Sequence, residues 1–378
     1  VTMMALPFFI LAGEIMNQGG LTKRIIAFCD IFLGRVRGGL GYVTIFACLM
    51  FAALVGSAVA ACAALGAILI PMMVRSGYNR EQSCALIASA NLVAPIMPPS
   101  VPMIIYGVSA GVSISSMFMA GIAPAVYLTL IACVVWFFKT RKKGVVPDVE
   151  DFKAPTPKEA LRIFGGGIWA LLLPIIILVG LHSGLFTATE AGVIACVYAI
   201  AVGLFVYREL KIKNLGKVFV NAAKMSAVVM FLAAAANCAA YFMTVSRIPQ
   251  LMTNGLDGLV SNPTLLMVVL MFIVVIVGLA MDVTPSILIL TPIMLPLVEE
   301  AGISPIYFGV CFVLMNVLGL TSPPVGPILN VACATGNIKM DKIIGPTMPY
   351  FIAQTVLCFL LAIFPPLVEI PMGWFGVT

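Results

Sequence analysis

The stretch "PPSVP" at residues 98–102 places three prolines within five residues of a long apolar segment. Proline lacks the backbone N–H that a helix needs, and its ring clashes with the preceding turn, so the cluster predicts a break in a helix. A second cluster, "PPVGP" at residues 323–327, lies in another apolar segment. The sequence therefore predicts two broken helices.

The composition indicates whether water or lipid surrounds these helices. Of the 378 residues, 62% are hydrophobic and only 10% are charged. Four long runs contain no Asp, Glu, Lys or Arg: residues 38–74, 82–138, 301–338 and 343–368. Such runs predict bilayer spans, and they lack the alternation of barrel strands. We expect an all-α polytopic membrane protein. The net charge of +6 lies in short loops, which indicates topology and no nucleic-acid partner.

An internal repeat relates the two proline clusters. When residues 56–124 are moved along the chain by 225 positions, five prolines fall on prolines, although chance alone would align about one. Pro71, Pro98, Pro99, Pro102 and Pro124 fall on Pro296, Pro323, Pro324, Pro327 and Pro349. Asn91 also falls on Asn316. The two halves are therefore expected to share one architecture.

Basic residues orient the two copies in the membrane. The loops 139–162 and 208–217 are rich in Lys and Arg, so both should be cytoplasmic. Counting spans outward from them, the first broken span, residues 81–110, runs from inside to outside. The second broken span, residues 305–336, runs from outside to inside. The sequence thus predicts inverted repeats.

Each copy also contains a segment that should enter and leave the membrane on one side. Residues 38–74 and 263–298 lie between loops on the same side, and each is long enough for two short helices. We expect re-entrant helical hairpins that turn at "VGSAVA" (55–60) and "MDVTPS" (281–286).

Two further segments have apolar spacing with charged faces. Residues 19–39 and 208–224 suit helices in the membrane interface, with plain loops as the alternative for their ends. The expected division is a scaffold helix with an arm (1–37), a transport domain (38–112 and 263–338) and further scaffold elements (113–262 and 339–378). The chain begins at Val1, so a segment of the protein is expected upstream.

Inverted repeats with hairpins and broken spans are the pattern of secondary transporters. A break frees backbone carbonyls that can coordinate Na⁺, and it exposes helix N-termini that attract anions. The candidate ion- or substrate-binding residues are Gly56, Ser57, Asn91, Pro98, Pro99, Ser100, Asp282, Thr284, Ser286, Asn316, Gly319, Thr321 and Ser322. The Na⁺ sites are expected near Ser57, Asn91, Gly319 and Ser322, since neutral oxygen ligands suit a hard cation.

The carboxylates in apolar surroundings need separate interpretation. Asp282 is the only charge between Asp257 and Glu299, so it is a candidate ion ligand; as a helix N-cap it would have a structural role, and both interpretations stay open. For Glu190 we favour the role of a negative charge at a helix N-terminus. Glu14 presents the same choice.

Enzyme chemistry has little support in this sequence. The ten cysteines are scattered through apolar runs without metal-ligand spacing, and the one histidine, His182, ends a span. No motif resembles a nucleotide loop or a nucleophile with its base. We expect a protein that is not an enzyme and has no organic cofactor.

Six motifs carry a resemblance to a known family. In chain order they are "PFFILAGEIMNQGGLTKRI", "GSAVAACAALGAILIP", "APIMPPSVPMIIYGVSAGVSI", "GLFTATEAG", "MDVTPSILILTPIMLPLVEEAGISPIYFGV" and "GLTSPPVGPILNV". Over essentially the whole chain they resemble the large (M, DctM-like) membrane subunit of tripartite ATP-independent periplasmic (TRAP) transporters. The resemblance implies a Na⁺-driven elevator transporter of the ion transporter superfamily in the bacterial inner membrane.

The resemblance also implies partners and a site. The family works with a small membrane subunit of the Q type and with an extracytoplasmic binding protein of the P type, which delivers an organic acid. The positions that match the family's ion and substrate region are the turn at Gly56 and Ser57, residues 91–100, the turn at 281–286 and the "GLTSPP" break.

This sequence also departs from the family pattern. Many members carry Asp or Thr where this sequence has Ala61, which argues against a polar contact there. The family's N-terminal segment is absent as well. Substrates of similar proteins are C4-dicarboxylates, sialic acid and sugar acids, and the motifs "LAGEIMNQGG" and "MDVTPSILILTP" resemble the members that handle sugar acids.

Other functions remain as alternatives. The first is a self-sufficient Na⁺/carboxylate symporter of related hairpin architecture, which would need neither partner. A channel is more remote, because polar residues cluster at mid-membrane and do not follow a continuous path. An intramembrane enzyme is the least favoured, because the sequence shows no constellation of acid, base, nucleophile or metal ligands.

Overall fold

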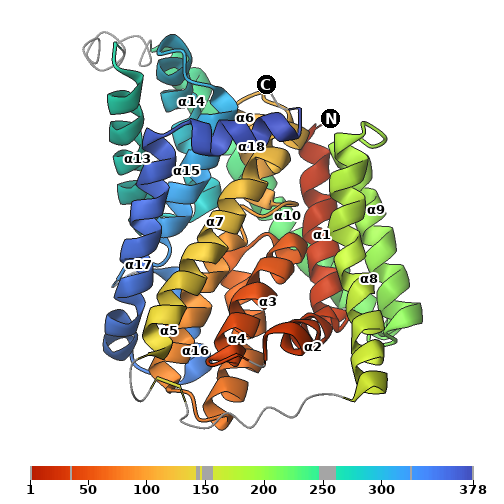
Figure 1. Ribbon diagram of the computed structural model, residues 1–378. Coiled ribbons are helices and arrows are strands. Elements are labelled where there is room, and N and C mark those ends of the chain that lie inside the picture. Colours follow the sequence, from red (N-terminus) through yellow and green to blue (C-terminus); the bar gives the residue numbers. More distant parts are fainter. Residues whose placement is uncertain are drawn as a thin grey trace.

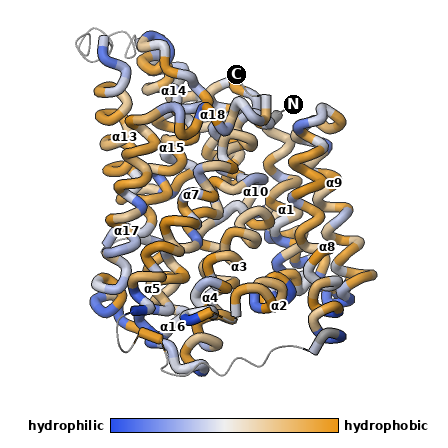
Figure 2. Tube along the Cα trace, viewed as in Figure 1, coloured by the Kyte–Doolittle hydropathy of each residue, from blue (hydrophilic) through white to orange (hydrophobic). Residues whose placement is uncertain are grey.

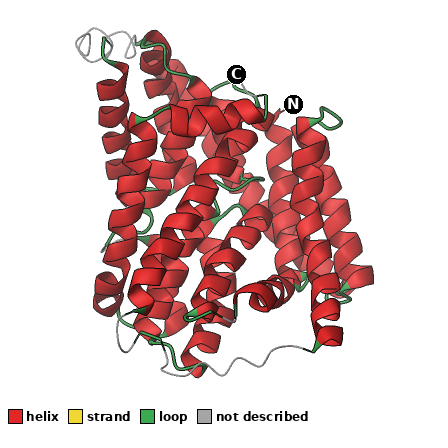
Figure 3. Ribbon diagram, viewed as in Figure 1, coloured by secondary structure: helices red, strands yellow, loops and turns green. Residues whose placement is uncertain are grey.

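The computed structural model describes residues 2–34, 36–141, 145–146, 156–246, 261–323 and 326–376. Every regular element among these residues is a helix (Figures 1 and 3). Eight of the described helices are long and apolar enough to cross a bilayer. The prediction of an all-α polytopic membrane protein is confirmed.

The described residues form sixteen α-helices. They are α1 (Ala5–Gln18), α2 (Leu21–Leu33), α3 (Gly39–Val55), α4 (Ala58–Arg75), α5 (Arg80–Ala90), α6 (Val101–Ser109), α7 (Ile114–Thr140), α8 (Pro157–His182), α9 (Ala188–Ala201), α10 (Ile212–Val245), α13 (Pro263–Ala280), α14 (Val283–Glu300), α15 (Pro305–Gly319), α16 (Pro327–Gly336), α17 (Met340–Ile363) and α18 (Pro366–Trp374). Short turns of other helical types are η1 (Thr2–Met4), η2 (Asn91–Val93) and η3 (Val202–Val206).

The internal repeat is visible in the helix bounds. Residues 58–75 form α4, and the same stretch moved by 225 positions is 283–300, which is α14. By the same shift α3 corresponds to α13, α5 to α15, α6 to α16 and α7 to α17, with differences of a few residues at the ends. The predicted repeat is therefore a structural one.

Both predicted hairpins are present. Gly56 and Ser57 alone separate α3 from α4, and Met281 and Asp282 alone separate α13 from α14. In Figure 1 the first hairpin enters from the bottom of the bundle and the second from the top. The two copies are thus inverted, as the charge distribution predicts.

Both predicted breaks are present as well. In the first, α5 ends at Ala90, η2 adds one turn, and α6 starts only at Val101. In the second, α15 ends at Gly319 and α16 starts at Pro327. Pro98 and Pro99 lie in the first gap, joined by a cis peptide bond. Proline breaks these spans because it cannot donate the backbone bond that would continue the helix.

Charge distinguishes the two ends of the bundle. Figure 2 shows hydrophilic segments gathered at the bottom, where α2, the start of α5 and the start of α8 lie. At the top, the described connections 110–113, 183–187, 261–262, 301–304 and the end segment 364–376 contain no Lys or Arg. By the positive-inside rule the bottom is the cytoplasmic end.

One of the two predicted interfacial arms is confirmed in outline and the other is wrong. After a turn at Gly19 and Gly20, α2 lies across the bottom of the bundle (Figure 1). The sequence predicts the second arm at 208–224 ahead of a separate span, but residues 212–224 are instead the first part of α10, a single helix of 34 residues. No proline interrupts α10 and alanine is frequent in it, so the helix continues.

Candidate functional site

The tip of the first hairpin rests on the first break, and we call this place the first junction. Gly56 has φ +62°, and a Cβ there would lie 3.2 Å from the Val101 nitrogen and 3.4 Å from the Pro99 oxygen. Only glycine combines this backbone conformation with such a close approach. The structure thus brings Gly56, Pro99 and Ser100 together, as the sequence predicts for the binding region.

Two helix N-termini meet at the first junction. Ser57 caps α4 by accepting a bond from the Ala60 N–H (3.4 Å), and Ser100 caps α6 by accepting one from the Met103 N–H (3.4 Å). The Ser100 hydroxyl donates to the Pro95 carbonyl. The carboxyl ends of α3 and η2 precede the same gap. The junction therefore combines N–H groups that attract an anion with carbonyls that suit a cation.

Asn91 lies at the start of the first break. Its side chain is fully buried, and its Nδ2 donates to the Ile87 carbonyl at 2.8 Å. Its Oδ1 has no hydrogen-bond partner among the described residues. A buried acceptor without a partner destabilises a fold by about 1–3 kcal/mol, so this oxygen is a candidate ligand atom.

Close backbone contact defines the second junction, where the end of α13 meets the end of α15. A Cβ on Gly319 would lie 2.4 Å from the carbonyl carbon of Gly278, and one on Gly278 would lie 2.7 Å from the Asn316 oxygen. Neither glycine can carry a side chain. Sequence reasoning selected Gly319 and missed Gly278, whose signal is a lone glycine in the branched apolar run "VVIVGLA" (274–280).

Asn316 is the counterpart of Asn91 in the repeat, and it is also fully buried. Both its Oδ1 and its Nδ2 lack partners among the described residues. Nearby in the chain, the Thr321 hydroxyl donates to the Leu318 carbonyl (3.0 Å) and the Ser322 hydroxyl to the Gly319 carbonyl (2.9 Å). Each hydroxyl oxygen keeps lone pairs that can serve a cation.

The second hairpin tip has the local structure that the N-cap interpretation predicts. Asp282 Oδ1 accepts a bond from the Val283 N–H at 2.8 Å, and the carboxylate is exposed. The buried Ser286 hydroxyl donates to the Asp282 carbonyl at 2.9 Å, while Thr284 is half-buried. The N-cap is confirmed, and the role of ion ligand stays a prediction.

The other two carboxylates lie elsewhere in the fold. Glu190 forms a capping box at the start of α9, because its Oε2 accepts from the Thr187 N–H at 2.8 Å. The favoured interpretation of Glu190 is therefore confirmed. Glu14 Oε1 accepts from Asn221 Nδ2 at 3.2 Å, so this carboxylate links α1 to α10.

The two junctions belong to one packed unit. Leu92 and Ile96 of the first break and Val317 and Leu318 of the second line the same small apolar gap. Nearer the external end, the Tyr106 hydroxyl of α6 donates to the Pro305 carbonyl of α15 at 2.7 Å. The first break and the last turn of α15 thus pack against each other, so the two junctions are neighbours in the fold.

Sequence reasoning also missed Gln354, a buried polar residue in the apolar helix α17. Its Nε2 donates to the Ser89 carbonyl of α5 at 3.0 Å, and its Oε1 has no partner among the described residues. This side chain attaches α17 to the first broken span just before the break. An isolated glutamine in an apolar segment was the available signal.

The arrangement suits a light alkali cation better than a transition metal. The polar atoms that surround both junctions are neutral amide, hydroxyl and carbonyl oxygens, and such oxygens suit hard cations. Among the described residues no group of three or more His, Cys, Asp or Glu side chains is placed to hold a metal ion. Of the ten free cysteines, eight are buried, one half-buried and one exposed, as expected for small apolar side chains.

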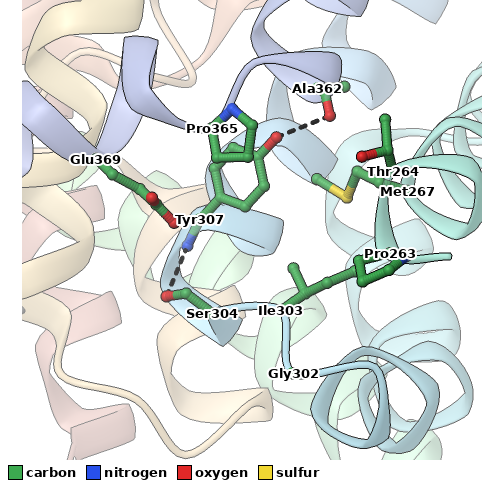
Figure 4. A pocket seen from close by; sticks show the side chains of 10 residues that line it. All are labelled: Pro263, Thr264, Met267, Gly302, Ile303, Ser304, Tyr307, Ala362, Pro365 and Glu369. Atoms are coloured by element: carbon green, nitrogen blue, oxygen red, sulfur yellow. Dashed lines mark hydrogen bonds between the residues drawn. The ribbon is translucent and has the colours of Figure 1, made fainter. Parts of the chain in front are cut away.

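Figure 4 shows a separate pocket of about 190 Å³ at the external end, between α13, α15, α17 and α18. Its walls include Ser304, which caps α15, and Tyr307, whose hydroxyl donates to the Ala362 carbonyl at 2.8 Å. The one charged side chain in its lining is Glu369. A carboxylate in the wall repels an organic anion, so this pocket does not suit an acidic substrate.

Comparison with known proteins adds a family and several named relatives. Residues 1–367 match the family model described as the DctM component of the tripartite ATP-independent periplasmic transporter. A putative TRAP transporter large permease protein of Haemophilus influenzae is 46% identical over 373 residues, which cover 99% of this chain and 87% of that protein. The 2,3-diketo-L-gulonate TRAP transporter large permease protein YiaN of Escherichia coli is 44% identical with the same coverage.

A solved structure shares the fold. The YdaH transporter of Alcanivorax borkumensis, described as having an unusual topology, matches with a TM-score of 0.55. The match covers 98% of this chain and 85% of that one at 17% sequence identity. This likeness supports the architecture of hairpins and broken spans and nothing about the substrate.

Proposed function

Since the chain belongs to the DctM family of tripartite ATP-independent periplasmic transporters, we propose that it couples the inward movement of Na⁺ to the import of an organic acid. The family assignment and the apolar helices make it a multi-pass protein of the bacterial inner membrane. The coupling ion, the substrate and the mode of movement are the proposed parts.

One observation carries the proposal of Na⁺ coupling. Asn91 and Asn316 occupy equivalent positions in the repeat, both are fully buried, and both present an amide oxygen without a partner among the described residues. Each lies at the end of a helix that stops in the middle of a span. A bound Na⁺ would satisfy these oxygens together with the carbonyls freed at the breaks.

The proposed substrate is an organic carboxylate, with sugar acids first. Relatives are named for 2,3-diketo-L-gulonate at 44% identity, for C4-dicarboxylate at 35% and for sialic acid at 29%. At the first junction the N-termini of α4 and α6 come together, and their partial positive charge attracts a carboxylate. The second copy places α14 and α16 in the equivalent positions.

The family description of a tripartite transporter supports two partners: a small membrane subunit and an extracytoplasmic binding protein that delivers the substrate. A relative of Oleidesulfovibrio alaskensis named as an isethionate permease DctMQ is 36% identical, and this chain covers 58% of its length. Its name combines the large and small components, which is consistent with their close association. The proposed movement is an elevator, in which the hairpins and broken spans slide together against fixed helices.

The bonds of α7 and α17 suggest where the moving unit ends. The sequence-based division places both helices in the scaffold. Lys139 of α7, however, donates to Gln82 Oε1 of α5 at 2.7 Å, and Gln354 of α17 donates to the Ser89 carbonyl. We therefore extend the proposed mobile unit to α7 and α17, and assign α1, α8 and α9, which pack on one another, to the static part.

Uptake into proteoliposomes tests the function. The large subunit would be reconstituted with its small partner, with and without the binding protein, under an inward Na⁺ gradient. Radiolabelled sugar acids, sialic acid and C4-dicarboxylates would be compared, with a K⁺ gradient as the control. We expect uptake that requires both Na⁺ and the binding protein. Uptake without the binding protein would favour a self-sufficient symporter, and uptake under K⁺ alone would reject the Na⁺ sites.

A further inference from the structure

A second, larger cavity is lined by elements other than those that form the junctions. It has a volume of about 1040 Å³ and opens at the cytoplasmic end between α2, the first turns of α8 and the segment 206–209. None of its lining residues belongs to a hairpin or a broken span. The transport mechanism proposed above gives this cavity no role.

The charges around the cavity leave an excess of cations. Arg24 pairs with Glu209 at 2.9 Å and stacks over the Tyr207 ring at 3.8 Å, so this pair is internally balanced. Glu159 accepts bonds from the Thr156 N–H (2.9 Å) and hydroxyl (2.8 Å), which bind its carboxylate to the start of α8.

Lys23 and Arg162 complete the charged lining. Both are exposed, and neither forms an ion pair among the described residues. With the Arg24–Glu209 pair balanced and Glu159 still negative, Lys23 and Arg162 leave the lining one positive charge in excess. An open cavity with an excess of positive charge attracts an anionic group.

Glycines in α8 keep the cavity open. The helix contains three in succession, Gly165, Gly166 and Gly167, although interior glycines weaken a helix relative to alanine. Packing explains Gly167, since a Cβ there would lie 2.7 Å from the Phe28 ring. A Cβ on Gly165 would meet nothing within 4 Å, and Gly165 and Gly166 both line the cavity. Their missing side chains leave room for a ligand rather than for protein.

The aromatic side chains in the lining indicate the kind of ligand. Trp169 and Tyr207 line it, and such aromatic side chains concentrate at the membrane–water interface. Beyond the cavity, α8 runs toward the opposite end of the bundle (Figure 1). Leu172 and Ile176 follow Trp169 at helical spacing on the same side of α8, and both are half-buried. These surroundings suit a ligand with an anionic head at the interface and apolar tails along α8.

We propose that this cavity binds the headgroup of an anionic phospholipid from the cytoplasmic leaflet. Lys23 and Arg162 attract the phosphate, Trp169 and Tyr207 flank the glycerol region, and Leu172 and Ile176, which continue the same side of α8, contact the acyl chains. Basic pockets of this kind on the cytoplasmic side are suited to anionic headgroups. A soluble phosphate would use the same cations without gaining the contacts along α8.

The test uses the complex of the large and small membrane subunits, reconstituted in equal amounts of phosphatidylglycerol and phosphatidylcholine and then re-extracted in mild detergent. Mass spectrometry of the extracted lipid counts the molecules retained per complex. We expect phosphatidylglycerol to be enriched in the wild type, and Lys23→Gln and Arg162→Gln to lower its retention by about fivefold each. Gly165→Leu, which fills the cavity without changing charge, should lower retention as strongly as the double charge variant.

Gly345→Leu is the matched control, because a Cβ on this glycine of α17 also meets nothing within 4 Å. It should retain phosphatidylglycerol like the wild type. Equal retention in the wild type, the double charge variant and Gly165→Leu would reject the site. Thermal stabilisation by inorganic phosphate equal to that by short-chain phosphatidylglycerol would show a free-anion site and reject the lipid. Loss of the small subunit from Gly165→Leu with lipid retention unchanged would show that a protein helix fills the cavity, and would also reject the proposal.

Discussion

The two junctions are built from equivalent helices of the two repeats, but the contacts between those helices differ. In the second, Gly278 and Gly319 bring two backbones together so closely that no side chain fits at either position. The equivalent positions of the first copy hold Ala53 and Ala94, which are buried without requiring glycine. Repetition thus preserves the helix bounds, while the distance between the helices at the site has diverged.

The polar side chains of the two junctions also differ, both in how many hydrogen bonds they form and in charge. Asn91 bonds through its Nδ2 to Ile87, whereas neither amide atom of Asn316 has a partner among the described residues. The neutral Ser57 caps the first hairpin tip, and the charged Asp282 caps the second. Fewer satisfied groups and one negative charge lead us to expect tighter cation binding at the second junction.

Gly319→Val should have the largest effect of any single substitution at the two junctions. Its Cβ would lie 2.4 Å from the Gly278 backbone, which cannot move aside as a flexible side chain could. We expect a loss of about 3 kcal/mol or more in the free energy of unfolding and no measurable uptake. Melting temperature and Na⁺-driven uptake measure the two effects. Gly345→Val, in open space, is the control, and wild-type behaviour of Gly319→Val would show that the close contact is unnecessary.

Alanine at the two asparagines tests the expected difference in cation binding. Asn316→Ala removes an unsatisfied amide, so the melting temperature in choline should hardly change, while the stabilisation by Na⁺ should disappear. That stabilisation is about 2.7 kcal/mol at a Na⁺ concentration one hundred times its Kd. Asn91→Ala should lower stability by about 1 kcal/mol in choline, because it loses the bond to Ile87, and by more in Na⁺, because it also loses a proposed ligand oxygen. If Na⁺ stabilised Asn316→Ala as much as the wild type, the second junction would not be a Na⁺ site.

Features with a local cause could be predicted from the sequence. The breaks coincide with clusters of prolines at 98–102 and 323–327, whereas single prolines such as Pro71 and Pro124 lie inside helices. Clustered prolines interrupt several consecutive backbone bonds, so both breaks were predictable. Ser57 and Asp282 are N-cap residue types placed before helix-forming runs, and both form the caps. The repeat itself followed from the spacing of prolines alone.

Features that depend on distant parts of the chain were missed. Gly278 is special only because α15 lies against it, and Gln354 only because Ser89 is its neighbour, 265 positions away. The continuity of α10 was missed for a different reason. Its charged first half resembles an interfacial arm, but without proline nothing ends the helix before the apolar half begins.

Substitutions at the hairpin tips should have smaller effects that separate capping from charge. Asp282→Asn keeps a good cap, so stability should hardly change, while Na⁺-driven uptake should fall if the charge assists the cation. Asp282→Ala and Ser57→Ala should each lower stability by about 1 kcal/mol. Uptake and expression are measured side by side. Normal uptake by Asp282→Asn would leave this carboxylate with capping as its only function.

Gln354→Leu should have the smallest effect, and it tests how each junction is held from outside. Gln354 of α17 donates to the Ser89 carbonyl of the neighbouring helix α5. Its counterpart in the repeat, Thr129 of α7, donates instead to the Ala125 carbonyl of its own helix, at 2.9 Å. The first junction is therefore attached to α17 by a bond that the second junction lacks in α7. We expect Gln354→Leu to lower stability by about 1 kcal/mol or less, because it also removes the unpaired Oε1.

Uptake should fall more than this loss explains, because α17 and the first break would no longer move as one unit. Thr129→Val is the matched control, and an equal fall in uptake there would show that the bond between the helices has no special role.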